Sequence, residues 1–481
     1  MRTRLIKDSL KACKFYKIIL IFYIFFLHLS PNTVYKVNIM IRNLRNLRSR
    51  DYIAFNFMLL ISAVLMILAF IVDTPTNLFN GFLLIVKSRS ILITDYVEVG
   101  GLGATLLNVS IVGFSAVFTF IKIGVKPNGA NIMAFWMSIG FAFFGKNVFN
   151  MIPLTIGVWL YAKRCKSQFA DYYIAAVLVA TVSPTISEIA FLGRFNPIAE
   201  IIAGILMGFF IGFIFPAISN ATVKVHSGFN LYNLGFAGGL VATIITTVLR
   251  SMGHDVEPAR HWSTGNNTFF AILLYTFAFM MLLMGIFSSA PKDDSQKGLE
   301  GLKERIKFSF SEYFKIHEHH GKLSIDYHNL YGKSVYINMA VLMVFATSIV
   351  LALGADLNGP TLAGILTMTG FGSLGKHVKN VAPIVIGAII SAYANRWDPT
   401  APANILAILF SSGLAPFAGA FGPIWGLIAG FIHVNIAVYV GDLNGGLNLY
   451  NNGFAACFVV MFLLPIVSIF KLGGKYTKRD I

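Results

Sequence analysis

Ten apolar runs of about twenty residues divide this sequence, and that pattern restricts it to the folds that a lipid bilayer permits. Apolar side chains make up 56% of the 481 residues and charged side chains only 12%, whereas an ordinary globular chain carries about 25% charged residues. Because hydrocarbon offers the backbone no hydrogen-bond partners, each run is predicted to cross the membrane as a helix. The runs lie at 54–73, 104–123, 171–191, 198–219, 231–249, 268–288, 335–354, 402–418, 422–441 and 452–470.

Two further apolar stretches are broken by Gly, Lys, Asn and Pro, so that each is predicted to form a pair of short helices. The first pair is 130–144 with 149–162, and the second is 360–374 with 381–395. The longest polar interval, 290–325, carries charges of both signs, and its apolar side chains recur at near-helical spacing, which predicts an amphipathic surface helix. These apolar side chains are Leu302, Ile306, Phe308, Phe310, Tyr313 and Phe314.

The sequence contains two copies of one pattern. A shift of 230 residues superposes 124–157 on 354–387, and a shift of 218 superposes 227–239 on 445–457. An apolar chain aligns Leu and Ile by chance, but not Asn, Lys, Pro and Gly in one order, so we infer an internal repeat. Matched pairs include Asp95/Asp326, Asn108/Asn338, Asn128/Asn358, Gly145/Gly375, Lys146/Lys376, Asn150/Asn380, Pro153/Pro383 and Gly157/Gly387.

The number of membrane crossings predicts how the two copies are oriented. Each copy has five long runs and one broken pair, so it crosses an odd number of times whether the pair crosses twice or not at all. Two such copies are predicted to lie inverted in the bilayer, as in many transporters. Cytoplasmic loops carry an excess of Lys and Arg, and one orientation satisfies that rule. In that orientation the basic regions all lie on the cytoplasmic side. They are the segment 1–50, Lys122 with Lys126, the cluster 163–166, the loop 291–325 and the tail residues Lys471, Lys475, Lys478 and Arg479.

The expected fold class is therefore an all-α polytopic protein of the plasma membrane with both termini cytoplasmic. Residues 1–50 hold eleven Lys/Arg against one Asp, so much of the net charge of +17 lies where anionic lipid would attract it, and no nucleic acid is needed. Ile18–Leu29 is predicted to be an interfacial helix, and translation from Met1 or from Met40 is left open. The expected parts are a basic segment at 1–51, repeat 1 at 52–250, a loop at 251–267, repeat 2 at 268–470 and a basic tail at 471–481.

The broken segments are the first candidates for function, because irregular backbone at membrane depth survives only where protein buries it or where it lines a cavity. An intramembrane lysine costs about 2.5–3.5 kcal/mol on insertion scales, so the two lysines indicate a polar cavity or the membrane interface. The alternative is an ordinary helix–loop–helix connection outside the membrane. The residues assigned here to a substrate path are Lys146, Asn150, Pro153, Lys376, Asn380 and Pro383.

A second repeated motif, Asn-Leu-Tyr-Asn-x-Gly-Phe-Ala, places two amides on one helix face. Inversion would bring both copies of that face towards one axis, where amide and phenol groups suit a polar solute. The alternative is a helix cap, since Asn230 and Asn448 directly precede apolar runs. The path residues assigned here are Asn230, Tyr232, Asn233, Asn448, Tyr450 and Asn451. Glycines at every fourth position predict close helix packing and no chemistry, at Gly204, Gly208, Gly212, Gly422, Gly426 and Gly430.

Glu188 lies within an apolar run and is assigned as a proton or ion site, with a helix end beside Arg194 as the alternative. No metal site and no cofactor are expected. The histidines at 317–320 lack the spacing of a zinc motif and lie in a polar loop. Cys13, Cys165 and Cys457 are far apart in the sequence and support neither a disulfide framework nor a metal cluster.

The order of these motifs resembles the urea-transporter fold, in which two inverted halves each carry a re-entrant helix. That family has an Asn-Asn-Pro-Leu-Thr-Gly-like stretch followed by a Gly-Tyr-Asn-Gly-like stretch in each half. Here Asn150-Met-Ile-Pro153-Leu-Thr-Ile-Gly157 precedes Tyr232-Asn233-Leu-Gly235. The second copy lacks Leu-Thr, and neither copy has the adjacent asparagines. The whole chain also resembles an uncharacterised bacterial multi-spanning family of unknown function.

The leading functional hypothesis is a channel or transporter, not an enzyme, for a small polar solute, either amide-like or a small anion. Its path would run between the inverted halves, and its partners would be the lipid bilayer and the solute, with a homo-oligomer left open. Helix N-termini at the breaks, together with two lysines, favour an anion or a carbonyl oxygen over a cation. The alternative is a membrane-embedded enzyme or sensor that uses the polar loops 250–266 and 291–325.

Overall fold

The computed structural model describes residues 52–257, 259–288, 298–395 and 398–471. The predictions for Ile18–Leu29, for the translation start and for nearly all of the basic tail lie outside these residues. Within them the chain is helical, with short 3-10 turns and three isolated β-bridges. In the part of the chain that the structure describes, nine helices are long and apolar enough to cross a membrane, and one bent pair would bring the number to ten.

The predicted spans agree with these helices. The run predicted at 171–191 is the bent pair, in which Tyr173–Val182 and Pro184–Ala190 meet at 51°. The run predicted at 335–354 begins earlier, because two short turns before it extend the span to Tyr327–Ala352. The other spans are Ile53–Val72, Leu102–Ile123, Pro197–His226, Asn233–Ser251, Asn267–Ser288, Pro402–Phe421, Pro423–Leu443 and Asn451–Phe470.

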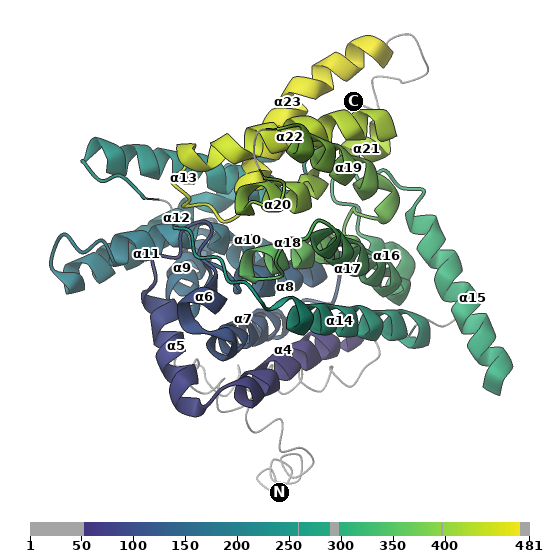
Figure 1. Cartoon of the computed structure of the whole chain (residues 1–481), viewed down its shortest axis with the longest axis horizontal. Coiled ribbons are helices and arrows are strands. Elements are labelled where there is room, and N and C mark those ends of the chain that lie inside the picture. The colour runs from purple at the N-terminus through teal and green to yellow at the C-terminus, as the bar shows by residue number, and fades with distance from the viewer. Residues whose placement is uncertain (1–51, 258, 289–297, 396–397, 472–481) are drawn as a thin grey trace, which may run out of the picture. The chain divides into compact units, whose positions relative to one another are not determined.

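The order of elements in the first half recurs in the second (Figure 1). The first half comprises α4 (Ile53–Val72), α5 (Pro75–Lys87), α6 (Tyr96–Gly100), α7 (Leu102–Ile123), α8 (Gly129–Phe141), α9 (Val148–Arg164), η2 (Phe169–Asp171), α10 (Tyr173–Leu178), η3 (Val179–Val182), α11 (Pro184–Ala190), α12 (Pro197–His226) and α13 (Asn233–Ser251). The second comprises α14 (Asn267–Ser288), α15 (Gly298–Ile316), α16 (Tyr327–Tyr331), η4 (Gly332–Ser334), α17 (Val335–Ala352), α18 (Gly359–Gly370), η5 (Phe371–Ser373), α19 (Val378–Ala394), α20 (Pro402–Phe410), η6 (Ser411–Leu414), α21 (Ala415–Phe421), α22 (Pro423–Leu443) and α23 (Asn451–Lys471).

Helix α5 was not predicted, because its 13 residues are too few to cross a bilayer. Its start nevertheless has a local signal: Thr74 accepts a hydrogen bond from the Asn77 amide, and Pro75 occupies the first turn. The amphipathic helix predicted within 290–325 is α15 from Gly298 onwards, and its Tyr313 and Ile316 are buried. Residues 289–297 lie outside the description.

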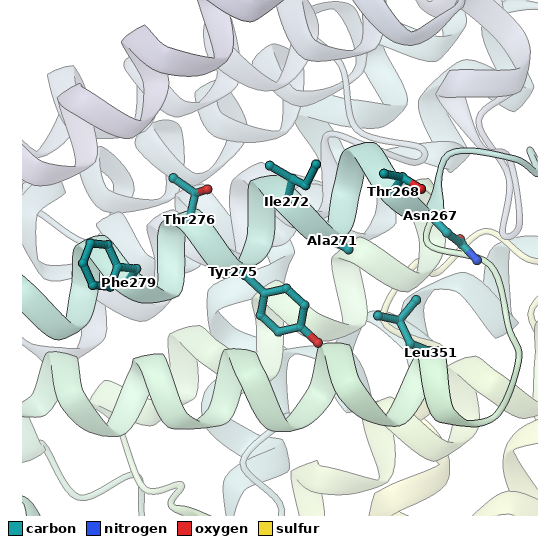
Figure 2. Close-up of a pocket in the computed structure, with 8 residues that line it drawn as sticks. All are labelled: Asn267, Thr268, Ala271, Ile272, Tyr275, Thr276, Phe279 and Leu351. Atoms are coloured by element: carbon teal, nitrogen blue, oxygen red, sulfur yellow. The ribbon is translucent and has the colours of Figure 1, made fainter.

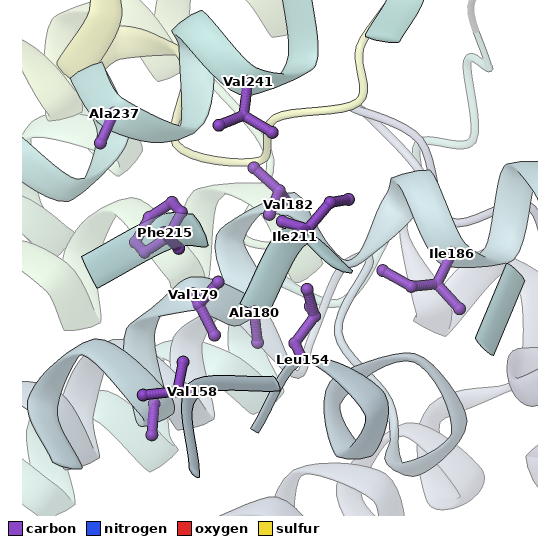
Figure 3. Packing of buried hydrophobic residues seen from close by; sticks show 11 residues of the cluster. Leu154, Val158, Val179, Ala180, Val182, Ile186, Ile211, Phe215, Ala237 and Val241 are labelled. Carbon is purple, nitrogen blue, oxygen red and sulfur yellow. The ribbon is translucent and has the colours of Figure 1, made fainter. Parts of the chain in front are cut away.

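Close helix packing builds the core of each half, as the glycine stripes predict. A Cβ atom at Gly212 of α12 would lie 2.1 Å from the Leu154 carbonyl oxygen of α9, and one at Gly430 of α22 would lie 1.9 Å from that of Ile384 in α19. Figure 3 shows the resulting core of the first half, where side chains of α9, α12 and α13 interlock. Any larger residue at these glycines would push the helices apart.

Helices α8 and α18 pack against each other in antiparallel directions near the middle of the structure (Figure 1). Gly129 begins α8 and accepts a hydrogen bond of 2.8 Å from Ser373, which follows α18. Conversely, a Cβ atom at Gly359, which begins α18, would lie 2.5 Å from the carbonyl oxygen of Phe143, which follows α8. Helices α8 and α18, which occupy matched positions in the sequence repeat, therefore run in opposite directions.

Candidate functional site

The two broken segments have the same hydrogen-bonded geometry. Gly145 and Gly375 each have φ of +90°, a conformation that side chains rarely adopt, so glycine is required in both copies. An asparagine of the long helix before each broken pair, α7 or α17, braces each break. Asn108 donates to the carbonyl oxygens of Ala142 and Lys146, at 2.8 and 2.9 Å. Asn338 donates to the corresponding pair, Gly372 and Lys376, at 2.7 Å each.

Helix α9 begins at a capping box, and so does α19, which explains why the chain becomes helical again directly after each break. Asn147 and Asn150 exchange side-chain and backbone hydrogen bonds in the first copy, and His377 and Asn380 do so in the second. The side-chain NH₂ groups of Asn150 and Asn380 also donate to Gly145 and Gly375. These two predicted path residues therefore use their polar groups within the breaks.

The copies hold each other through reciprocal contacts. Asp326 accepts the Gly129 amide at 3.0 Å, and Asp95 accepts the Gly359 amide at 3.2 Å, so each copy caps the broken helix of the other. Burial raises the pKa of Asp95, while hydrogen bonds from Ser263, Val97 and Gly359 partly oppose that shift. The same contact is therefore made in both directions between the matched segments.

A second reciprocal pair corrects the cap interpretation of the Asn-Leu-Tyr-Asn motif. The side chain of Asn230 donates to the carbonyl oxygen of Gly453 at 2.9 Å, and that of Asn448 donates to Gly235 at 3.0 Å. The cap considered from the sequence is displaced by two residues: Asn230 accepts the Tyr232 amide at 2.9 Å, and Tyr232, without a side-chain cap, precedes α13. These asparagines instead join the two copies.

Tyr232 and Tyr450 meet where α13 and α23 begin, with ring centroids 4.5 Å apart. The Lys376 ammonium contacts the Tyr232 hydroxyl, bonds Ser412 Oγ at 2.9 Å and lies over two aromatic rings. Lys376 is 0% exposed, and among the described residues no carboxylate lies within ion-pair distance of it. A buried cation without a counter-ion is costly. We call Lys376, Tyr232, Ser412 and Tyr450 the central cluster.

Lys146 is the equivalent lysine of the first copy, and its side chain takes another direction. Its ammonium donates to Ser138 Oγ at 3.1 Å and to the Val177 carbonyl oxygen at 3.2 Å. It is only 4% exposed, and the described chain offers it no carboxylate either. Among the described residues, two buried lysines thus have no carboxylate partner, and one of them belongs to the central cluster.

The remaining predicted path residues lie away from the central cluster or pack structurally. Asn233 bonds Thr222 and His226 of α12, and Asn451 accepts from Asn444 at 2.6 Å. Pro153 and Pro383 pack at Gly208 and Gly426, the middle glycines of the two stripes. That these four line a path stays a prediction.

Glu188 lies in a buried ion cluster. Its carboxylate accepts Arg89 Nε at 2.6 Å, contacts Arg89 Nη2, and lies 2.8 Å from His254 Nε2. The hydrogen bond to Glu188 raises the pKa of Arg89. Its partners are thus Arg89 and His254 rather than Arg194, the neighbour considered from the sequence. The ion-site assignment stays a prediction.

A groove of about 700 Å³ lies elsewhere, along the outer side of α14 (Figure 2). Ile272 and Phe279 line it and are more than half exposed, which suits contact with lipid. In the described chain, no group of three metal-binding side chains is positioned to hold a metal ion.

The sequence reasoning missed Ser412, the Phe371 ring beside Lys376, and the roles of Asp95 and Asp326. The two aspartates had a signal, because they were already matched in the repeat. Ser412 had no such signal. The reciprocal backbone contacts of η3 and η6 match Ser412 with Ala180 of the first copy, so the serine is not repeated.

Many apolar spans around buried polar breaks define a multi-pass membrane protein. The chain belongs to the family described as "Protein of unknown function (DUF1576)", which matches residues 74–251 and 306–469. Among curated proteins and among solved structures, none matches it.

Proposed function

We propose that this protein is a transporter or channel that moves a small polar solute between two inverted copies of one membrane unit. The antiparallel packing of α8 and α18 supports inversion, because equivalent helices of inverted copies run in opposite directions. The reciprocal contacts at Asp95 and Asp326 support the same arrangement. In this proposal the chain performs no catalytic step.

The observation that carries the proposal is Lys376, fully buried at the junction of the copies with no described carboxylate beside it. An ionisable group within a membrane protein's interior is costly and marks ion or substrate pathways. A purely structural junction would be more stable with an apolar residue there. The broken helices α8–α9 and α18–α19 interrupt the chain at matched positions of the two copies, as the discontinuous helices of transporter sites do.

Flux measurements test the proposal. We expect full-length protein in proteoliposomes to move at least one solute from a panel of small neutral and anionic compounds faster than protein-free vesicles. Asn338→Leu, which removes the brace of the second break, should abolish that flux. Correctly folded protein that moves no member of the panel would contradict transport.

Labelling tests the inversion independently. Cys165 is exposed after α9, and Ala394, the last residue of α19, lies at the equivalent end of the second copy. Inversion predicts that an impermeant maleimide labels Cys165 from the cytoplasmic side. Ala394→Cys in a Cys165→Ser background should be labelled from the opposite side. Labelling of both from one side would contradict inversion.

A sensor is the second candidate, and the contact between His317 and His377 favours it. Their ring centroids lie 5.1 Å apart, and His377 caps α19 directly after the second break. Protonation in the polar loop would thus act on a broken helix. If solute flux were absent while acid pH changed protease sensitivity around α19, the sensor would replace the transporter.

A further inference from the structure

The central cluster has hydrogen-bond donors and a cation but no negatively charged group. Lys376 contributes an ammonium, and Ser412 and Tyr232 contribute hydroxyls that contact it. Hydroxyls and ring faces soften the burial of a cation, but they do not neutralise it. The group that would complete this set is therefore an anion.

The buried hydroxyl of Tyr450 is a second, independent observation. Tyr450 is 1% exposed, and its hydroxyl makes no hydrogen bond of 3.5 Å or less within the described residues, where the Tyr232 hydroxyl is its polar neighbour. A buried polar group without a partner is rare in folded proteins and calls for an explanation, such as a ligand. Its ring packs 4.5 Å from that of Tyr232, which itself lies against Lys376, so this unused donor belongs to the same cluster.

The charge of the ligand follows from counting cations. Lys146 faces Ser138 and Val177 instead of the tyrosine pair, so the central cluster has one ammonium. Asp95 and Asp326 already occupy the N-termini of α18 and α8, which removes those helix ends as further anion sites. One cation fits a ligand with one negative charge.

The walls of the cluster indicate what the rest of the ligand is made of. Phe141 and Phe410 contact Tyr450 at 5.4 and 5.8 Å between ring centroids, and Phe371 lies 5.2 Å from Tyr232. Aromatic walls favour an apolar body over a second charged or strongly hydrated group. Because Tyr232 and Tyr450 touch, the rings would have to part to admit even a small molecule.

We propose that Lys376, Ser412, Tyr232 and Tyr450 bind a small monocarboxylate, with its carboxylate at the ammonium and hydroxyls and its apolar end among the rings. This proposal names the solute class of the proposed transporter. Of its tests, only the flux measurement rests on the proposed function. Binding itself can be measured without transport.

Pairs of carboxylates and their isosteric amides test the charge. We would measure the melting temperature of purified full-length protein with formate, acetate and lactate, and with formamide, acetamide and lactamide. Uptake of the same compounds into proteoliposomes would be measured against protein-free vesicles. We expect at least one carboxylate to stabilise the protein by several degrees and to enter about tenfold faster than its amide.

Two matched pairs of variants assign the effect to the cluster. Tyr450→Phe removes only the unpartnered hydroxyl, so the fold should persist while carboxylate uptake falls about tenfold. Tyr336→Phe is its control, because Tyr336 is also buried with an unpartnered hydroxyl but packs against Phe57. Lys376→Gln should remove carboxylate binding, whereas Lys379→Gln, at an exposed position of α19, should not. If Lys376→Gln fails to fold, the comparison of Tyr450→Phe with Tyr336→Phe tests the site.

The outcomes separate the two proposals. Equal stabilisation and uptake of amides and carboxylates would overturn the monocarboxylate site and leave the transporter intact. Stabilisation by a carboxylate that Tyr450→Phe abolishes, without flux of any solute, would keep the site and overturn transport. Loss of carboxylate binding in Tyr336→Phe to the same degree as in Tyr450→Phe would overturn the site.

Discussion

The two breaks have the same backbone geometry, but the side chains around them differ. In the first copy, Asn147 donates to Tyr96 at 3.0 Å, and Tyr96 in turn bonds Ser90 at 2.8 Å. In the second copy, His377 replaces that asparagine and donates to the His319 carbonyl oxygen at 2.8 Å. The equivalent tyrosine, Tyr327, is buried with no described partner for its hydroxyl. The tyrosine hydroxyl beside the first break is hydrogen-bonded, and the one beside the second break is not.

The side chains of Lys146 and Lys376 have different neighbours because each lies beside a serine that the other copy lacks. Ser138 stands beside Lys146, and the equivalent position in the second copy is Met368. Ser412 stands beside Lys376, and its equivalent in the first copy is Ala180. Each ammonium bonds the nearby serine of its own copy, because a buried donor needs an acceptor. The duplicated scaffold therefore presents one lysine to the central cluster.

Removal of the brace should have the largest effect and should be equal in the two copies. Asn108→Leu and Asn338→Leu each leave two buried carbonyl oxygens without a donor. At about 1–3 kcal/mol for each of the two orphaned groups, we expect a loss of roughly 2–6 kcal/mol in the free energy of unfolding. Thermal unfolding in detergent would measure it. A large loss in one copy alone would refute the equivalence of the breaks.

Removal of the two serines should have a smaller and unequal effect. Ser412→Ala deprives Lys376 and Tyr232 of a shared partner, so solute uptake should fall about tenfold, equivalent to ~1.4 kcal/mol. Ser138→Ala affects only the lysine outside the central cluster and should change uptake less than about twofold. The reverse ranking in a flux assay would show that the first copy binds the solute.

Acidification should produce the smallest effect. Burial, together with the charge of Lys379, lowers the pKa of His317, which packs on Tyr313 and His377. The unfolded chain then binds this proton more readily than the folded protein, so stability decreases as pH falls below about 6.5.

We expect the melting temperature to drop by a few degrees between about pH 7.5 and pH 5. His317→Gln should reduce that drop, since its side chain does not titrate. If His317→Gln melts with the same pH dependence as the wild type, His317 is excluded as the source of the pH-dependent loss of stability.

Much of the fold follows from local signals that the sequence displays. Span length, the glycine stripes and the repeat predicted the long helices and both breaks, because apolar length and backbone freedom act over a few residues. The capping box at Asn147 and Asn150 was present but was interpreted as part of a path. Helix α5 was missed because it has a start signal without the length of a span.

The site was only partly predictable. Lys376, Tyr232 and Tyr450 were assigned from the repeat alone, whereas Asn233 and Asn451 were assigned to the same path and lie against their own copies. Helix periodicity indicates which residues share a face, but it does not indicate which neighbour that face contacts.

The sequence by itself determined the membrane class, the duplicated order of helices and the glycine at each break. Which lysine enters the central cluster was decided only by tertiary structure. Ser412 lies 36 residues from Lys376 and Tyr232 lies 144 residues away, so their contacts exist only once η6 and α13 pack beside the second break. A buried ammonium takes whatever acceptors the packed fold places within reach, and that choice is not encoded in the residues beside it.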